Sequence, residues 1–549
     1  MFNPQSIKTM KKILTFAFLL TLALQAGAQG WTDALNFSDN DYLGTARSVG
    51  MGNAMTAVGG DLGSLTFNPA GSAVASYSQF TLTPGLSFST VTGQGSLVDD
   101  AGYSIGFEDK IRTTNGRMGL PNFGVMMVYD TRNRSGLKRV SFGIVGNVTR
   151  DYTNRLRAQG TNASTTLAGS LASQADGYTT DILSGSFYQN GIPSWETMVG
   201  YQSGIFGDIN GKYVGLTETL WDNGNITTSD KLSQYYGLRR SGSKYDLLMN
   251  FGLDFNDRFY LGANFGLVTL DYRSDETRSE EALAGMDYGN HFESLRMRSS
   301  LRDSGSGIYM KVGFIARPFD GLRIGAAIQT PTLFDIREEY QLEGRSVADN
   351  IEMLQSSPKD EWFYRLKAPF RANAGIAYTI SKMALLSADY EYTNYTGMKL
   401  VPAYDDAYYF DFSDANLDIQ DFTGPVHAVR LGAEIKPAPE LALRVGYNFT
   451  TGAQYNTLSD DGRVVALSDQ ERKDQIRTAV SFGIGYSSPG SFFLDAAVRF
   501  QYLPNEYFTP YWYYTRVDGK TYTDNGVTTP EICSQSALCN ALVTLGWRF

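Results

Sequence analysis

The residues of this sequence best placed to act together chemically are charged side chains at alternate positions of short segments. Guanidinium groups pair with carboxylates through two parallel hydrogen bonds, and both partners occur on one parity of these segments. Such a set can bind the carboxylate of a ligand, or it can form an internal network of ion pairs, and the second interpretation is favoured. The members are Arg371, Arg430, Arg444, Arg477, Arg499 and Arg548, with Asp389, Glu391, Glu434 and Asp495.

Nucleophilic and metal-binding residues are scarce. Two histidines and two cysteines are too few for a zinc cluster, and neither His291 nor His427 has a serine in an evident triad context. We therefore expect no enzymatic activity, no metal and no cofactor. Cys533 and Cys539 lie six positions apart, just before and within the last predicted strand. They could close a small disulfide loop in an oxidising compartment, but the spacing is awkward, and both alternatives stay open.

An alternation of apolar and polar residues with a period of two runs through most of the chain. In residues 537–549 one parity is wholly apolar and the other is mixed, as expected for a strand whose two faces meet different environments. Short connections alternate with long ones along the series. The pattern predicts fourteen strands, at residues 78–90, 121–130, 138–150, 243–255, 258–272, 305–317, 322–335, 363–380, 384–397, 425–437, 441–453, 473–488, 491–504 and 536–549.

Short turns at one end, long loops at the other and apolar-out, polar-in strands are typical of outer-membrane β-barrels. A soluble β-sandwich or propeller also alternates. Aromatic residues, however, gather at strand ends on the apolar parity, as in interfacial girdles, while charges lie in strand interiors on the opposite parity. A bilayer forbids unpaired strand edges, so the sheet must close. We predict an all-β fold, a 14-stranded antiparallel transmembrane β-barrel over residues 78–549, in contact with outer-membrane lipid.

Composition and the N-terminus agree with this prediction. The net charge is −10 with scattered basic residues, which argues against a nucleic-acid partner, and 34 tyrosines, 32 phenylalanines and 57 glycines suit strands and tight turns. No apolar run of about 18 residues follows residue 28, so helical membrane spans are excluded. Residues 1–28 combine three lysines, an apolar stretch at 13–24 and the small residues 26–28. They read as a cleaved signal peptide, and we expect a location in the outer membrane of a Gram-negative bacterium.

Residues 31–77 break the alternation. They are dense in glycine and small residues, which permit close backbone packing. A segment of this kind ahead of the first strand could fold into the lumen as a plug, because a fourteen-strand barrel is wide enough to leak when nothing fills it. The other interpretation is a flexible periplasmic leader. The plug is favoured, and we assign it residues 29–77.

The run ARSVGMGNAMTAVGGDLGSLTFNPAG, residues 46–71, resembles the N-terminal hatch of the FadL/TodX family of outer-membrane transporters. Three later runs, at residues 313–325, 368–378 and 429–434, are also similar to that family. The hatch motif falls on Asn68, Pro69, Ala70 and Gly71. The resemblance implies a fourteen-strand barrel with an N-terminal plug that carries long-chain fatty acids or similar hydrophobic molecules inward without energy coupling. It also implies that Arg47 and Asp61 join the polar network that holds the hatch.

The resemblance leaves other interpretations open. Barrels similar to this family also serve as partner or shuttle components of surface-protein secretion machines, which is the alternative function. On the fatty-acid interpretation, the lumen arginines would bind the head group. The chain also departs from the family in its loops, the longest at residues 151–242, so no ligand residue is carried over from the family.

The loop at residues 151–242 holds apolar side chains that could capture a hydrophobic ligand or pack the loop onto itself, and packing is slightly favoured. The candidates for capture are Phe187, Trp195, Met198, Phe206 and Trp221. Ser194 is placed to cap a helix over residues 195–205. The chain ends on the aromatic residue Phe549, which we expect the outer-membrane assembly machinery to recognise.

Overall fold

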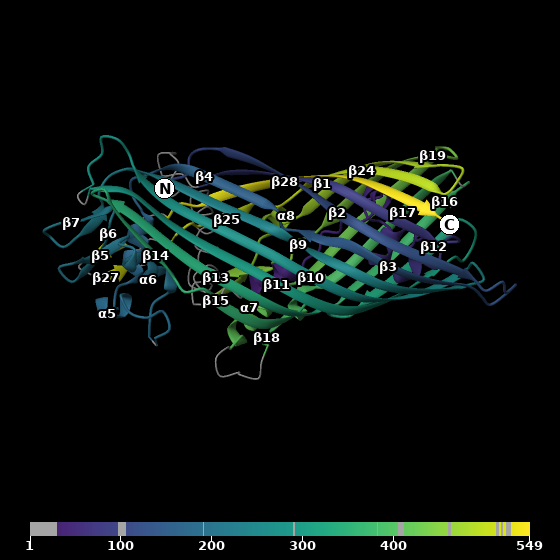
Figure 1. Ribbon diagram of the computed structural model, residues 1–549, viewed down its shortest axis with the longest axis horizontal. Helices are drawn as coiled ribbons and strands as arrows, with labels where there is room; N and C mark the ends of the chain where they lie inside the picture. Colours follow the sequence, from purple (N-terminus) through teal and green to yellow (C-terminus); the bar gives the residue numbers. More distant parts are fainter. Residues whose placement is uncertain are drawn as a thin grey trace.

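The computed structural model describes residues 30–96, 106–189, 191–288, 291–381, 383–403, 411–458, 463–511, 515–517, 520–522 and 529–549. The predicted signal peptide at residues 1–28 lies outside the described residues. Within the described part, antiparallel strands pair edge to edge around a closed ring, and the first strand pairs with the last, Phe80 opposite Trp547. Figure 1 shows the elongated barrel, with the C-terminus marked near one end.

The ring contains fourteen strands in the described residues, which confirms the predicted number. Five of them are interrupted: β3 continues into β4 (Asn154–Asn162), β24 continues into β25 (Glu506–Phe508), and three others are given below with two labels each. The members in order around the barrel are β1 (Gln79–Gly95), β2 (Ile111–Asp130), β3 (Leu137–Asp151), β9 (Leu232–Phe255), β10 (Phe259–Ala282), β11 (Phe292–Ala316), β12 with β13 (Leu322–Gln329, Leu333–Ala348), β16 with β15 (Arg371–Ile380, Asp360–Lys367), β17 with β18 (Ala384–Asn394, Lys399–Pro402), β19 (Pro425–Ala438), β20 (Leu441–Thr450), β23 (Arg477–Ser487), β24 (Phe492–Tyr502) and β28 (Ile532–Arg548).

The interruptions and turns follow from local chemistry. Pro331, Pro369 and Pro504 fall in three of the five breaks, where a residue without a backbone N–H cannot extend a ladder. The turn between β9 and β10 places Asn256 and Asp257 at φ 61° and 57°, a conformation that these two residue types tolerate better than most. The long-loop end is uneven, because β9, β10 and β11 continue for 24 or 25 residues while β16, β20 and β23 have 10 or 11.

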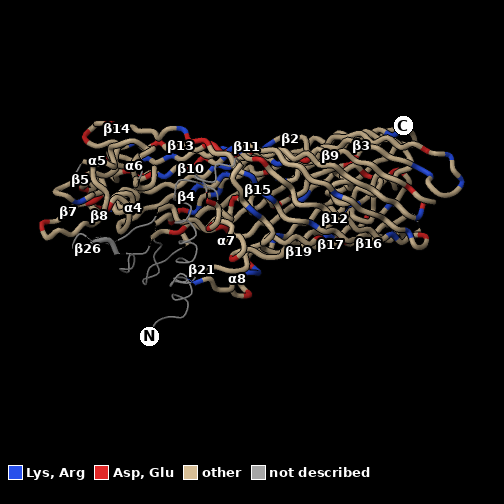
Figure 2. The backbone as a smooth tube through the Cα atoms, turned by 90° about the horizontal axis from the view of Figure 1, so that it is seen from below, with Lys and Arg blue, Asp and Glu red and all other residues tan. Residues whose placement is uncertain are grey.

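An apolar band surrounds the outside of the barrel near its short-turn end. On β10 the outward residues from Phe259 to Leu267 are apolar, and Asp271 and Arg273 follow beyond them. On β20 the corresponding band runs from Leu441 to Phe449. Nine residues tilted by about 40° span about 23 Å, close to the apolar height of outer-membrane barrels. Figure 2 shows charged residues crowded along the extensions of β10, β11 and β13 instead.

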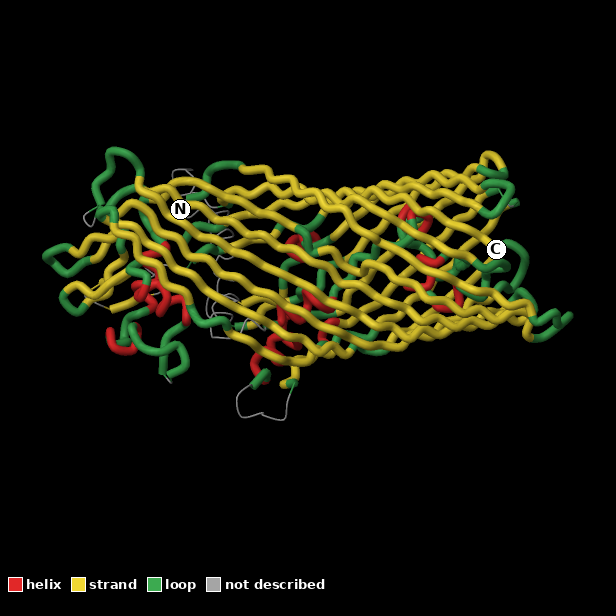
Figure 3. Tube along the Cα trace, in the orientation of Figure 1, coloured by secondary structure: helices red, strands yellow, loops and turns green. Residues whose placement is uncertain are grey.

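The N-terminal segment lies inside the barrel. Its helices are α2 (Trp31–Ser38), α3 (Ala46–Gly50), η2 (Leu62–Thr66) and η3 (Pro69–Gly71). Nearly every residue from 42 to 75 is buried. The short helices contact strands on all sides of the ring, from β2, β3 and β9 to β23, β24 and β28. Figure 3 shows them within the outline of the strands.

The remaining elements belong to the long-loop end. Residues 163–231 form a small subdomain with its own apolar core, which packs against the inner side of the extended wall at Leu295, Met297 and Leu342. Its elements are α4 (Leu167–Gln174), α5 (Thr180–Leu183), α6 (Trp195–Gln202), β5 (Phe206–Ile209), β6 (Lys212–Gly215), β7 (Glu218–Leu220) and β8 (Ile226–Thr228). The others are β4 (Asn154–Asn162), β14 (Ile351–Ser356), η4 (Tyr395–Gly397), α7 (Ser413–Phe422), β21 (Asn456–Leu458), β22 (Val464–Ala466), α8 (Asp469–Asp474), β25 (Glu506–Phe508), β26 (Thr515–Val517) and β27 (Lys520–Tyr522).

The structure corrects the predicted lengths of several strands and loops. Residues 273–304, predicted as a loop, mostly belong to β10 and β11, and much of 91–120 and 232–242 is strand as well. The apolar alternation stops at the edge of the band, but the ladder continues because strands outside a bilayer need no apolar face. Among the described residues, no helix has the length and apolar character to cross a membrane.

Candidate functional site

The wall of the barrel meets the N-terminal segment at a ring of inward glycines on β10, β11, β12, β19 and β20. A Cβ atom added at Gly446 would overlap the backbone nitrogen of Gly52, and one at Gly432 would overlap the carbonyl oxygen of Met51. Because these two contacts are with backbone atoms, no side chain can move aside to relieve them, whereas at Gly313 the nearest atom is the side-chain oxygen of Asn68. Only glycine allows the segment to lie directly on the wall there. The members of this glycine ring are Gly262, Gly313, Gly325, Gly432 and Gly446.

The hatch motif forms the contact with β10 and β11. Asn68 caps η3 by accepting a hydrogen bond from the N–H of Ala70 at 3.0 Å. Its amide nitrogen donates to the carbonyls of Thr56 at 2.8 Å and of Phe314 on β11 at 2.9 Å. Pro69 occupies the first helical position, where its missing N–H needs no partner. One fully buried side chain therefore joins two parts of the segment and the wall.

Basic side chains of the wall bind backbone carbonyls of the segment. The ammonium group of Lys244 donates to the carbonyls of Phe37 at 2.7 Å and Asp39 at 2.6 Å, and Arg371 donates to that of Ser38. These carbonyls lie at the C-terminal end of α2, where a cation also interacts favourably with the helix dipole. Lys311 binds the carbonyl of Thr66 in the same way, at 2.6 Å. The sequence analysis did not single out either lysine.

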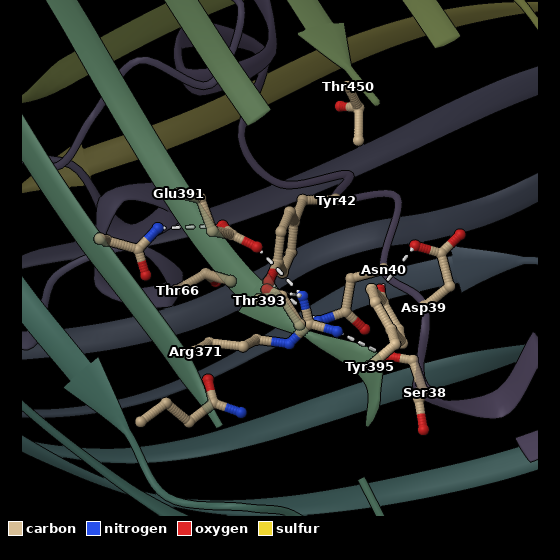
Figure 4. A network of polar contacts seen from close by, with 12 residues as sticks. Ser38, Asp39, Asn40, Tyr42, Thr66, Arg371, Glu391, Thr393, Tyr395 and Thr450 are labelled. Carbon is tan, nitrogen blue, oxygen red and sulfur yellow. Dashed lines mark hydrogen bonds and ion pairs between the residues drawn. The ribbon is translucent and has the colours of Figure 1, made fainter. Parts of the chain in front are cut away.

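The predicted arginine and acid residues form two separate groups of ion pairs. In the first, Glu391 pairs with Arg371 at 3.0 Å and with Arg430 at 2.8 Å. Figure 4 shows Arg371 between Glu391 of the wall and Ser38 of the segment. All three side chains are almost fully buried, so removing one partner would leave an uncompensated charge.

The second group lies nearer the short turns. Glu434 pairs with Arg444 at 2.6 Å and with Arg47 of α3 at 3.1 Å, and Arg444 also reaches Asp495. Arg47 therefore joins the segment to β19. Two cavities of about 200 and 260 Å³ open beside this group, and both are lined by Arg47, Tyr77 and Glu434.

Two acids of the segment that the sequence analysis missed complete the contact. Asp39 pairs with Arg477 at 2.6 Å and with Arg150, and Asp41 pairs with Arg499. Burial alone would raise the pKa of Asp39, but the neighbouring Arg477 and Arg150 outweigh it and hold that pKa well below its usual range. Asp39 and Asp41 follow α2 within the irregular region, where no periodicity marks them as inward-facing.

Three predicted members of the network are placed differently. Asp389 does not pair with an arginine but accepts a hydrogen bond from the N–H of Thr56 at 2.6 Å. Asp61 accepts hydrogen bonds from Thr45 and from the N–H of Gly63, so its contacts stay within the segment. Burial raises the pKa of Asp61, against the opposing effect of Arg47. Arg548 stacks on the ring of Tyr77 at 4.9 Å and on that of Phe493 at 4.6 Å.

Above these polar contacts the lumen is filled by apolar and aromatic side chains, here called the aromatic cluster. It joins α2 and α7 to the inward faces of β10, β13 and β15. The rings of Trp31 and Phe422 lie 5.7 Å apart, and those of Phe37 and Tyr272 lie 5.6 Å apart edge to face. Its main members are Trp31, Phe37, Tyr272, Phe334, Tyr364, Met398, Leu400, Phe412, Ile419 and Phe422.

The wall is interrupted at one seam. The β2–β3 ladder ends at Asn122 opposite Asn147, and beyond it β3 continues into β4, which pairs with β9. In the described part of the chain, the edge of β2 from residue 111 to 120 that faces β3 takes part in no ladder. Arg117 reaches across the seam and donates to the carbonyl of Gly242 at 3.0 Å.

The loop residues proposed for capture are mostly internal. Phe187, Trp195, Met198 and Phe206 are buried in the core of the 163–231 subdomain, so the packing interpretation describes these four. Trp221 is 55% exposed. Ser194 caps α6 as expected, accepting from the N–H of Thr197 at 3.2 Å, although the helix ends at Gln202 rather than 205.

The remaining polar candidates are one histidine and the two cysteines. His427 meets the hydroxyl of Tyr390 at 2.6 Å on the outer face of β17 and β19. Cys533 and Cys539 both lie in the single strand β28, where six residues span about 20 Å, and a disulfide requires Cα atoms within about 7 Å. This overturns the disulfide alternative.

No sequence model of a known protein family matches the chain, and no curated protein matches it. Several solved structures are similar to it. A FadL homologue of Pseudomonas aeruginosa is 13% identical, with a TM-score of 0.48, over 93% of this chain and 99% of that chain. The Pseudomonas putida toluene transporter TodX is 12% identical, with a TM-score of 0.47, over 93% and 100%. For the Ralstonia pickettii toluene transporter TbuX the values are 13%, 0.44, 92% and 98%. The resemblance stated from the sequence recurs in this comparison.

Proposed function

We propose that this chain is a plugged outer-membrane barrel that takes up hydrophobic small molecules, such as long-chain fatty acids, without energy coupling. The observation that carries the proposal is the aromatic cluster inside the lumen, directly above a tightly seated N-terminal segment. A water-filled porin has a polar lumen. An interior lined with aromatic and aliphatic side chains is instead suited to molecules that leave water readily.

The route that we propose runs from the long-loop end into the aromatic cluster and then sideways through the seam between β2 and β3. Straight passage requires the segment to leave its glycine ring and its ion pairs. The seam interrupts the backbone ladder of the wall in the described residues and is bridged by the side chain of Arg117. A side chain can swing aside at far lower free-energy cost than a plug held by many buried contacts.

The experiment that tests this function uses the mature barrel in lipid vesicles. Oleate and naphthalene are added outside, and their entry is compared with that of glucose and with entry into protein-free vesicles. We expect faster entry of both apolar probes and no entry of glucose. Equal entry rates of oleate and naphthalene with and without the protein would overturn the proposal.

The alternative function, a partner in a surface-protein secretion machine, is favoured by one observation. Residues 42–75 are buried almost throughout, which supports a segment that fills the lumen at its own level. A barrel used as a docking partner needs no open path. Affinity purification from the native membrane decides between the two functions: stable co-purification of secreted proteins, with normal fatty-acid uptake after deletion, would favour the alternative.

A further inference from the structure

Helix α7 comes from the connection between β18 and β19, yet its apolar side lies in the aromatic cluster. Ile419 is 0% exposed and Phe422 is 2% exposed. The ring of Phe422 contacts that of Trp31 on α2, with centroids 5.7 Å apart. On the opposite side of the same helix, Leu417 is 56% exposed. One face of a loop helix therefore fills space in the lumen next to the N-terminal segment.

The sequence of α7 gives the helix little stability of its own. Its N-cap residue is Phe412, whose side chain cannot cap the helix, and Asp411 accepts a hydrogen bond from the first helical N–H, that of Ser413, at 2.9 Å. Asp414, Asp418 and Asp421 are spaced by four and three residues, so like charges face one another along one side. No basic residue occupies the last turn to balance the helix dipole. Ten residues with these features are held in helical form mainly by the packing of Ile419 and Phe422.

The attachments of α7 are unequal at its two ends. At the C-terminal end, the carbonyl of Phe422 accepts from the N–H of Tyr455 at 2.8 Å, and the carbonyl of Asp421 accepts from Asn456 at 2.6 Å. Nearer the N-terminal end, Asn416 makes two hydrogen bonds to the backbone of Leu400 on β18, at 2.8 and 2.9 Å. When these two bonds break, the packing of Phe412 against the ring of Tyr364, 6.2 Å away, is the main contact left near the N-terminal end, while the C-terminal end keeps its hydrogen bonds.

We propose that α7 is a displaceable lid, and that Ile419 and Phe422 occupy the place of the hydrophobic cargo when the barrel is empty. Seating of α7 and binding of cargo are then mutually exclusive. Cargo that enters the aromatic cluster displaces the two side chains, and the helix turns outward about its C-terminal anchor. The inference rests on the proposed uptake function and adds to it the element that must move first.

The test is hydrogen exchange measured on the mature barrel in lipid nanodiscs, with oleate and with naphthalene as probes. We expect each probe to slow exchange in α2, which stays in the cluster, and to accelerate exchange in α7. Asn416→Ala removes the two bonds to the backbone of Leu400 and leaves every side chain of the cluster in place. It should accelerate exchange in α7 on the order of ten-fold and tighten probe binding in proportion. Leu417→Ala, on the exposed side of the helix, is the matched control and should do neither.

The outcomes separate the lid from the function. Protection of α2 and α7 together, or protection of α2 with α7 unchanged, would show that cargo binds with the helix seated and would overturn the lid while the uptake function stands. No change in α2 with either probe, combined with no uptake in vesicles, would overturn both. Phe422→Ala gives a second check, because it vacates the site: it should bind naphthalene more tightly than the parent protein, and weaker binding would contradict the lid.

Discussion

Replacing Gly446 by alanine is a sharp test of how the N-terminal segment is held. The new Cβ would overlap the backbone nitrogen of Gly52. The strand cannot retreat, because Gly446 is paired with Gly432 on β19 and with Ser481 on β23. The segment must therefore shift. Overpacking of this kind costs about 1–3 kcal/mol, which raises the unseated population about 5- to 150-fold.

The assay is leakage of glucose from vesicles, supported by trypsin cleavage after Arg47, a bond that is protected while the segment is seated. Gly119→Ala is the matched control, since nothing lies within 4 Å of a Cβ added at Gly119. Gly262→Ala, where the new atom would overlap the backbone of Pro69 and Ala70, should behave as Gly446→Ala does. If Gly446→Ala and Gly262→Ala show no more glucose leakage and no more trypsin cleavage than Gly119→Ala, the reasoning from the glycine ring is refuted.

Other predictions follow from single contacts. Asn68→Asp keeps the cap on η3 but loses both donated hydrogen bonds, so it should leak nearly as much as Asn68→Ala in the glucose assay. Because the pKa of Asp39 is lowered, its ion pairs stabilise the seated segment above about pH 4, and this stabilisation is lost as the pH falls further. Arg477→Gln removes the largest cause of the lowered pKa, so acid-induced leakage should begin at a higher pH in this variant. Burial raises the pKa of Asp33 to about 6, so ionisation of Asp33 destabilises α2. As the pH rises from about 4 to 6, hydrogen exchange in α2 should therefore accelerate by more than the intrinsic exchange rate of its amides does. Asp33→Asn should abolish that additional acceleration. Burial and two acidic neighbours raise the pKa of Asp418, so Asp418→Asn should slow exchange in α7 at neutral pH.

Local patterns predicted much of the architecture. A strand has a period of two whatever surrounds it, so the parity of apolar residues identified the fourteen strands and their outward-facing sides. Ser194 predicted the start of α6 because capping involves only the next three residues. Strand ends were harder to predict: beyond the apolar band, as at Asp271 on β10, the ladder persists without any apolar signal.

The partners of buried polar groups were only partly predictable. Inward parity placed Arg371, Glu391 and Arg430 in one inward-facing polar set, and the structure brings these three together. Parity could not show that Asp39 of the irregular segment pairs with Arg477, which lies 438 positions away. Nor could it show that Asp389 binds a backbone N–H instead of an arginine.

The sequence by itself determined which side chains face outward from the barrel and which face the lumen, because that division depends on strand geometry and on the alternation of apolar and polar residues alone. Only the tertiary structure decided that five glycines from separate strands form one contact ring, and that a loop helix reaches the aromatic cluster. Both features join residues that are far apart in the chain, and no local pattern records which inward positions become neighbours when a sheet closes.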